Sequence, residues 1–369
     1  MTLECFKPIT IGNMKLRNKF VRSATLEGMA TNKGQPIPLL KKFYCDLADG
    51  GIALIITGAS LVESYKNLPD IEGVGFPAAI DNDRFIKYWQ DIVSEVHQHG
   101  ARIAMQIVHP GRQDNPNLRT PIAPSAVPLE NKDIVPHEMT VEEIHAMVEK
   151  FAQACRRAYE SGFDAVQLHG GHGYLISNFL SPYTNRRTDE YGGSTLNRAR
   201  FVLDILKRVH ELIGTHFPVP IKMNCDDFIE GGMTGHEAVA IAKILTQAGI
   251  AAIEVTGGFA SNNPQRTFAK GINKREKEAY FRSYAKAIKE NISSPVILVG
   301  GLRSLEVSEK LITDGITDLV SMSRPFIREP GLIQRWMEGD LKRAQCISCN
   351  KCHDNVFWGG YLRCYMKKG

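Results

Sequence analysis

Short β-branched runs alternate along this chain with longer amphipathic segments, a pattern typical of strand–helix units around a parallel sheet. Eight strands are predicted, at Lys19–Ser23, Ile52–Thr57, Arg102–Ile107, Ala165–Leu168, Val219–Met223, Ala252–Thr256, Pro295–Val299 and Asp318–Met322. A helical segment follows each of them in turn, at Leu39–Leu47, Arg84–His99, Val141–Ser161, Leu196–Ile213, His236–Ala248, Lys277–Glu290, Leu305–Thr313 and Gly331–Glu338. Eight such pairs are the number that closes a TIM barrel, which is the predicted α/β fold.

Two of the helix starts have local support. Thr140 and Thr234 each precede a Glu by three residues, the spacing of a capping box in which the Thr hydroxyl and the Glu carboxylate satisfy free amide groups. Between Val141 and Ser161 apolar residues recur at intervals of three and four, which predicts one buried stripe. The alternative fold is a doubly wound sheet, but the Gly-Ala-Ser after Ile52–Thr57 is not the Gly-rich dinucleotide turn expected there.

Long connections follow the third and fourth predicted strands, from Pro110 to Thr140 and from Gly170 to Leu196. Segments of this length inside a compact domain are usually functional, and both leave the carboxyl ends of strands, where barrel active sites are built. No domain boundary is predicted before about Arg343. The chain is therefore divided into a barrel, residues 1–342, and a cysteine-rich extension, residues 343–369.

Composition narrows the class of protein. A chain of 369 residues with 43% hydrophobic and 23% charged residues suits a globular protein with a large core. The formal charge of +5 is spread along the chain instead of forming basic blocks, which argues against nucleic acid as a partner. The N-terminus has no apolar core of signal-peptide length and no later stretch suits a membrane helix, so a cytoplasmic location is expected. A homo-oligomer is compatible with the sequence.

Candidate catalytic side chains are most closely spaced just after the fourth predicted strand, where His169, His172 and Tyr174 follow one another. A metal site would need a third ligand of comparable spacing, and none is close in sequence. Structural histidines that fill the mouth of the barrel are a second alternative. The favoured interpretation is that the two imidazoles donate hydrogen bonds to a bound carbonyl and that the phenol supplies a proton.

These three residues belong to a longer pattern: His169-x-x-His172-x-Tyr174-Leu, Phe179-Leu-Ser181-Pro-x-x-Asn185-x-Arg187 and Asn197-Arg198-x-Arg200-Phe. The pattern strongly resembles the old yellow enzyme family, and the resemblance extends in order over most of residues 1–340. It implies that the barrel binds FMN and that NAD(P)H donates electrons to it.

The resemblance also implies which residues hold the cofactor. Gln106 would read the pyrimidine edge of the flavin through its amide, and Lys222 would place a positive charge near flavin N1 and O2. Backbone groups at two strand ends would wrap the flavin, and a Gly-Gly pair with an Arg would hold its phosphate. These further residues are Ser23, Ala24, Thr25, Gly58, Ala59, Gly300, Gly301, Ser323 and Arg324. Leu26 stands where the family commonly has Cys or Thr near flavin O4, so the flavin potential and substrate range stay open.

Four cysteines crowd the extension with the spacing Cys346-x2-Cys349-x2-Cys352-x11-Cys364. Four thiolates can bind a [4Fe–4S] cluster or Zn²⁺. The segment is similar to that of the family branch with 2,4-dienoyl-CoA reductase and trimethylamine dehydrogenase. That branch has three residues between its second and third cysteines, where this chain has two, and it carries a further C-terminal domain. A cluster, zinc, and free or disulfide-paired thiols are all open, and His353 is a spare ligand.

The predicted function is that of an ene-reductase. Hydride from NAD(P)H passes through FMN to the β-carbon of an α,β-unsaturated carbonyl, whose oxygen lies between His169 and His172, while Tyr174 protonates the α-carbon. One alternative is an iron–sulfur enzyme of the 2,4-dienoyl-CoA reductase type with a partner that supplies electrons. Others are a barrel aldolase or lyase that uses Lys222 as a Schiff base, and a non-catalytic flavin-binding protein. The substrate and the choice of NADH or NADPH are not set by the sequence.

Overall fold

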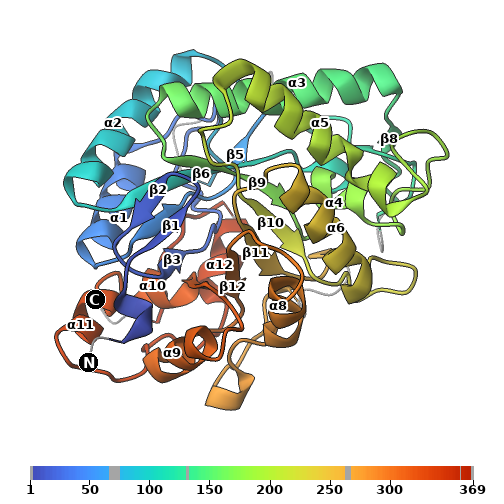
Figure 1. Cartoon of the computed structure of the whole chain (residues 1–369). Coiled ribbons are helices and arrows are strands. Elements are labelled where there is room, and N and C mark those ends of the chain that lie inside the picture. Colours follow the sequence, from blue (N-terminus) through green and yellow to red (C-terminus); the bar gives the residue numbers. More distant parts are fainter. Residues whose placement is uncertain (1–2, 66–74, 130–132, 262–266, 358, 367–369) are drawn as a thin grey trace.

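Eight parallel strands form a closed ring at the centre of the molecule (Figure 1). The computed structural model describes residues 3–65, 75–129, 133–261, 267–357 and 359–366. The first two residues, part of the predicted connection after the third strand and parts of the extension lie outside these ranges. The ring runs β3 (Phe20–Arg22), β4 (Leu54–Ile56), β6 (Arg102–Val108), β9 (Ala165–Gly170), β10 (Ile221–Asn224), β11 (Ile253–Thr256), β12 (Val296–Val299) and β13 (Leu319–Met322). The pairing of β13 with β3 closes it, so the predicted TIM barrel is confirmed.

Helices surround the ring, as Figure 1 shows. The eight predicted ones are present as α1 (Pro38–Asp49), α2 (Arg84–Gln98), α3 (Val141–Glu160), α5 (Thr195–Ile213), α6 (Gly235–Gln247), α8 (Arg282–Lys289), α9 (Leu305–Thr313) and α11 (Leu332–Met337). Both predicted capping boxes form, at Thr140 and Thr234. The predicted start of α8 at Lys277 is wrong, because Ala279 has a φ of +53° and Glu278 turns inward to accept the backbone N–H of Arg303.

Several short elements were not predicted, because runs of two to seven residues show too little periodicity. They are η1 (Glu4–Phe6), β1 (Ile9–Ile11), β2 (Met14–Leu16), β5 (Ser60–Leu61), η2 (Gly111–Gln113), β7 (Ile122–Ala123), β8 (His137–Glu138), α4 (Leu175–Leu180), η3 (Arg275–Lys277), α10 (Arg324–Arg328) and α12 (Lys351–Phe357). Two of them, α10 and α12, contribute residues to the site described below.

The barrel interior changes from apolar to polar along its axis. Apolar side chains of the β1–β2 hairpin pack against inward residues at the amino ends of the strands: Ile11, Met14 and Leu16 against Val21, Leu54, Ile56, Ala104, Ala165, Ala252, Ile297 and Leu319. Side chains of a strand alternate between faces, so residues two positions further along point inward again. On five strands those residues are polar, Ser23, Gln106, Gln167, Glu254 and Ser321, whereas β12 has Val299 there. The hairpin therefore closes one end, and a polar layer forms the floor of the other.

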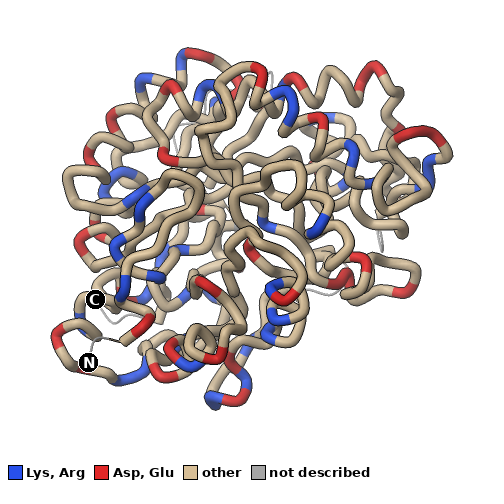
Figure 2. The backbone as a smooth tube through the Cα atoms, viewed as in Figure 1, with Lys and Arg blue, Asp and Glu red and all other residues tan. Residues whose placement is uncertain are grey.

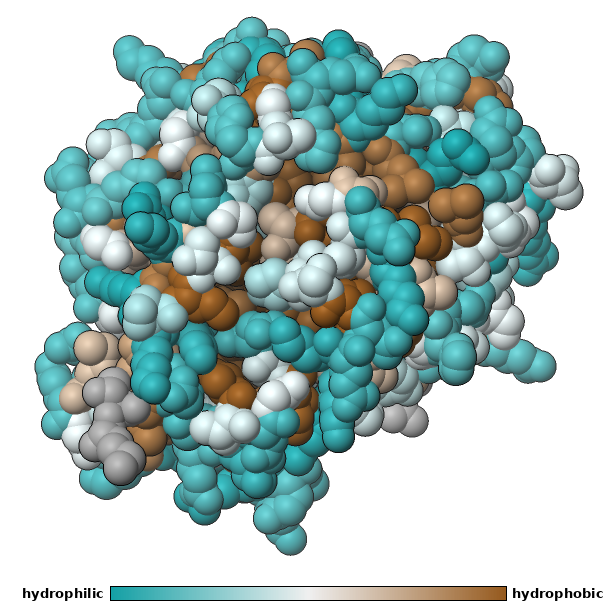
Figure 3. Space-filling model, viewed as in Figure 1, coloured by the Kyte–Doolittle hydropathy of each residue, from teal (hydrophilic) through white to brown (hydrophobic). Residues whose placement is uncertain are grey.

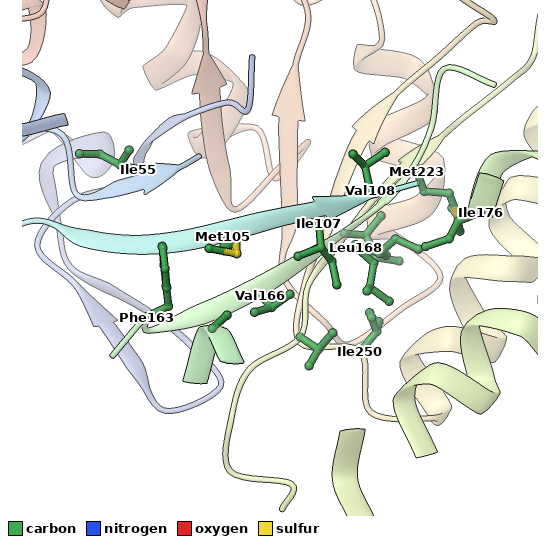
Figure 4. Close-up of a cluster of buried hydrophobic side chains, with 14 of the residues drawn as sticks. Ile55, Met105, Ile107, Val108, Phe163, Val166, Leu168, Ile176, Met223 and Ile250 are labelled. Carbon is green, nitrogen blue, oxygen red and sulfur yellow. The ribbon is translucent and has the colours of Figure 1, made fainter. Parts of the chain in front are cut away.

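Outward side chains of the same strands build the main core. Met105 and Ile107 of β6, with Val166 and Leu168 of β9, are fully buried between the strands and the outer helices (Figure 4). They alternate with the inward Gln106 and Gln167, as strand geometry requires.

The outer surface is mixed in charge. Figure 2 shows Lys and Arg interspersed with Asp and Glu over the outer elements, in agreement with a charge spread along the chain. In Figure 3 hydrophilic side chains cover most of this face, with apolar side chains gathered toward its centre. Within the described ranges, no helix is both long enough and apolar enough to cross a bilayer.

A group of ion pairs fastens the segment after β5 to the end of β6. The Glu63 carboxylate lies 2.8 Å from Nζ of Lys150 on α3 and 3.7 Å from both Nε2 of His109 and Nη1 of Arg119. The nearby His109 ring, together with Lys150 and Arg119, lowers the pKa of Glu63 to about 2. Glu63 therefore stabilises the fold in its ionised form.

Replacing Glu63 by Gln should lower the free energy of unfolding by about 2 kcal/mol at pH 7. The carboxyl has a lower pKa in the folded chain than in the unfolded chain, so its contribution is complete above pH 4.5 and is lost as the pH falls toward 2. Urea unfolding of both proteins at pH 7 and pH 3 measures this contribution. A difference in stability that stays constant between the two pH values would contradict the ion-pair explanation.

Candidate active site

A cavity with an empty volume of about 1200 Å³ opens at the carboxyl ends of the barrel strands. Its lining includes most of the predicted cofactor and catalytic residues: Ser23, Ala24, Thr25, Gln106, His169, His172, Tyr174, Lys222, Gly301, Ser323 and Arg324. Leu26 and Ala59 line it too. These residues come from seven of the eight strands or the segments that follow them, so the barrel brings together what the sequence separates by 300 positions.

Two predicted glycines lie beside the cavity, outside its lining. The backbone N–H of Gly58 donates to the Glu27 carboxylate at 2.9 Å, and a Cβ on Gly58 would come within 1.9 Å of that carboxylate. Glu27 is in turn paired with the buried Arg22 at 2.8 Å. Gly300 accepts the backbone N–H of Tyr280, and the next residue, Gly301, lines the cavity.

The floor of the cavity is a hydrogen-bonded network across the barrel. Nζ of Lys222 donates to Oγ of Ser23 at 2.7 Å and lies 3.5 Å from the Glu254 carboxylate. Glu254 also accepts from Ser23 and Gln167, and Gln167 accepts from the amide of Gln106 at 2.7 Å. Burial lowers the pKa of Lys222, while Glu254 opposes that shift by favouring the ammonium. The pair places a buried cation at the cavity with its charge partly offset.

Three rings meet at the end of β9. The ring centre of His169 lies 5.2 Å from that of His172 and 5.0 Å from that of Tyr174. Nε2 of His172 lies 2.8 Å from Oγ1 of Thr256, which orients this ring. The structure therefore places the three predicted catalytic side chains in one group.

The chain holds His172 in a conformation that few residues adopt. Its φ is +62°, and its backbone N–H donates to Oδ1 of Asn224 at 3.0 Å. The amide of Asn224 donates in turn to the fully buried Asp227 at 2.8 Å. Left-handed backbone costs a non-glycine residue of order 1 kcal/mol, and such outliers concentrate at functional sites.

Both imidazoles are uncharged at neutral pH. Burial, with a smaller effect of the Lys222 cation, lowers the pKa of His169 to about 3. Burial and the neighbouring His169 lower the pKa of His172 well below its ordinary value. Burial also raises the pKa of Tyr174, which keeps the phenol protonated. The group therefore offers neutral N–H donors and one O–H.

Part of the wall comes from segments for which the sequence had no local signal. Thr267 and Phe268 belong to the connection after β11, and His353 and Val356 to α12 of the extension. The Phe268 ring lies edge-on to His172 and tilted to His353, at ring-centre distances of 5.6 and 4.6 Å. In contrast, Glu254 and Thr256 could have been predicted as site residues, because the alternation of side chains along β11 places both on its inward face.

The four cysteines of the extension surround a second cavity, of about 600 Å³, next to the first. Arg324, Ile327, Asn350 and Cys352 line both cavities. Burial raises the pKa of Cys352 to about 11. Within the described part of the chain, no three His, Cys, Asp or Glu side chains form a group that would hold a single ion.

Comparison with known proteins agrees with this geometry. Residues 4–342 match the profile of the NADH:flavin oxidoreductase / NADH oxidase family. The chain belongs to this family. It is 37% identical over 361 residues to NADH oxidase of Thermoanaerobacter brockii, which covers 96% of this chain and 54% of that protein. It is 31% identical over 332 residues to NADPH dehydrogenase of Bacillus subtilis (strain 168), with 89% and 93% covered.

The solved structure of 2-naphthoyl-CoA reductase, in complex with 2-naphthoyl-CoA, has the same barrel. Its TM-score is 0.88 at 28% identity, over 99% of this chain and 57% of that one. The chain spans about half the length of several curated relatives that it matches, and covers 54%, 52% and 52% of three of them. The predicted old yellow enzyme family is thus confirmed over nearly the whole barrel.

Proposed function

We propose that this flavin oxidoreductase binds FMN in the barrel cavity and passes electrons from NAD(P)H to the C=C bond of an α,β-unsaturated carbonyl compound. The observation that carries the proposal is the group of His169, His172 and Tyr174 beside a buried Lys222. Neutral imidazoles suit a carbonyl oxygen, because each one keeps an N–H group that can donate a hydrogen bond to it.

The residues of the cavity fit FMN. Nδ1 of His169 and Oγ1 of Thr267 are buried without a hydrogen-bond partner in the described part of the chain, although both residues line the cavity. Buried polar atoms are nearly always paired, so these two atoms indicate a ligand or ordered water. Gln106 keeps its carbonyl oxygen and a second amide hydrogen for a pyrimidine-like edge, and Lys222 suits a site of developing negative charge.

FMN, held by Gln106, Lys222 and Arg324, would supply the hydride chemistry that links NAD(P)H to the β-carbon of the substrate. His169 and His172 would donate hydrogen bonds to the substrate oxygen, where negative charge develops. Tyr174 would give its phenolic proton to the α-carbon and regain a proton from solvent. Overall, NAD(P)H, one proton and an enone would be converted to NAD(P)⁺ and the saturated carbonyl compound.

Anaerobic turnover with 2-cyclohexenone tests this proposal. The protein and NADPH or NADH should yield cyclohexanone in equal amount to the nicotinamide oxidised. Oxygen must be excluded, because reduced flavins also react with it. The saturated ketone, which lacks the C=C bond, is the matched control and should oxidise no nicotinamide. A flavin that is reduced but never reoxidised by enones would refute the substrate class.

The cysteine cavity supports a second candidate, an iron–sulfur flavoenzyme of the 2,4-dienoyl-CoA reductase type with a separate electron donor. The favouring observation is that Cys346, Cys349, Cys352 and Cys364 line one cavity that adjoins the first. Anaerobically purified protein would then contain about four iron and four sulfide per chain. Replacing Cys349 by Ser should remove this iron. Protein without iron and sulfide would leave the first candidate alone.

A further inference from the structure

Asn350 connects the cysteine cavity to the predicted phosphate site. It lies between Cys349 and Cys352, is 4% exposed, and lines both cavities. Its Oδ1 accepts a hydrogen bond from Nη1 of Arg324, the predicted phosphate ligand. Its Nδ2 donates to the backbone oxygen of Phe268 at 2.7 Å. This buried amide thus has its acceptor and its donor both engaged.

The bonds of Arg324 lie on one side of its guanidinium. Nη1 donates to Asn350 and, at 2.8 Å, to the backbone oxygen of Ala269. Nε and Nη2 have no partner in the described ranges, and neither atom is among the buried unpaired ones. A guanidinium binds phosphate best through two parallel N–H groups, and Nε with Nη2 forms such a pair. Asn350 and Ala269 therefore hold the guanidinium from behind and leave this edge for an anion.

The backbone at Asn350 is set for this contact. Its φ is +65°, a conformation that Asn tolerates better than most residues, and Ser348 two positions earlier has a φ of +55°. The oxygen of Ser348 accepts the backbone N–H of Gly271 at 3.1 Å. The loop is thus bound to the cavity wall at two points, through Phe268 and Gly271.

We infer that Asn350 is a positioning residue for the phosphate group of the cofactor. It fixes the guanidinium of Arg324 with its Nε–Nη2 edge toward the cavity, and so makes the cysteine-rich extension part of the cofactor site. The inference rests on the proposed binding of FMN. A role through Arg324 predicts an effect on FMN, which carries a phosphate, and none on riboflavin, which lacks it.

Replacing Asn350 by Gly separates these effects, because glycine adopts a φ of +65° freely and only the side-chain contacts are lost. Holoenzyme is incubated with rising riboflavin, and the bound flavins are separated and quantified. The ratio of riboflavin to FMN dissociation constants should fall about tenfold in the variant. Iron content, measured in the same samples, shows whether the cysteine loop has changed as well.

A ratio equal to that of the wild type would overturn the inference, including the case in which both flavins bind more weakly by the same factor. If the Gly variant does not fold, Asn350→Asp provides the same test. Its carboxylate keeps the shape of the side chain but pairs with Arg324 and repels phosphate, so the ratio should again fall. An unchanged ratio there has the same meaning.

A double-mutant cycle distinguishes this inference from the proposed function. Arg324→Ala should lower the same flavin ratio, and adding Asn350→Gly to it should cause no further change. A further fall in the double variant would mean that Asn350 acts without Arg324, which contradicts the inference. If Arg324→Ala leaves the ratio unchanged, the phosphate site itself is wrong, and the inference falls with that part of the proposed function.

Discussion

Replacing Tyr174 by Phe should slow transfer from the reduced flavin to an enone by about 10²- to 10⁴-fold and leave flavin reduction by NAD(P)H nearly unchanged. The phenol lies 5.0 Å from His169 between ring centres, and burial raises its pKa so that it holds a proton to donate. Hydride uptake by the flavin needs no such proton from the enzyme, and Phe keeps the shape of the ring.

Stopped-flow measurement of the two half-reactions, one with NAD(P)H and one with 2-cyclohexenone, checks this expectation. Tyr88→Phe is the control, since Tyr88 lies on the outside of α2 with 42% of its surface exposed. Its half-reactions should match those of the wild type. Equal slowing of both half-reactions in Tyr174→Phe would refute the role of Tyr174 as proton donor.

Replacing Lys222 by Met should lower the free energy of unfolding by about 3–5 kcal/mol and slow flavin reduction. Met leaves the fully buried Glu254 carboxylate without its cation, and it removes the positive charge that favours reduced flavin. Two effects with different causes are thus expected from one change.

The double variant Lys222→Met with Glu254→Gln separates these effects. Gln removes the unpaired charge, so stability should largely return, whereas flavin reduction should stay slow. Urea unfolding and anaerobic NAD(P)H reduction of both variants provide the measurements. Recovery of the reduction rate in the double variant would show that Lys222 acts by supporting the fold and not through its charge.

The barrel could be predicted from the sequence because each buried strand and helix has a recognisable pattern of apolar residues in its own segment. All eight ring strands and eight helices were found, since an apolar run or a stripe is a local pattern. The start of α8 was not, because it depends on Glu278 turning toward Arg303, a contact between residues 25 positions apart. Contacts between residues so far apart in the sequence produce no periodic pattern that could be recognised in it.

The candidate site, like the fold, could be predicted only in part from the sequence. His169, His172 and Tyr174 stand in one short motif and were predicted to act together. The Glu254 partner of Lys222 was missed, although strand alternation places both inside the barrel. Asn350 could not have been found at all, because its importance arises from the folding of the extension against Arg324.

The most direct measurement of the central claim is the visible spectrum of anaerobically purified protein before and after addition of NAD(P)H. A resolved flavin spectrum that bleaches, with FMN as the extracted cofactor, is the predicted result. A colourless protein, or a flavin that NAD(P)H does not reduce, would contradict the proposed function.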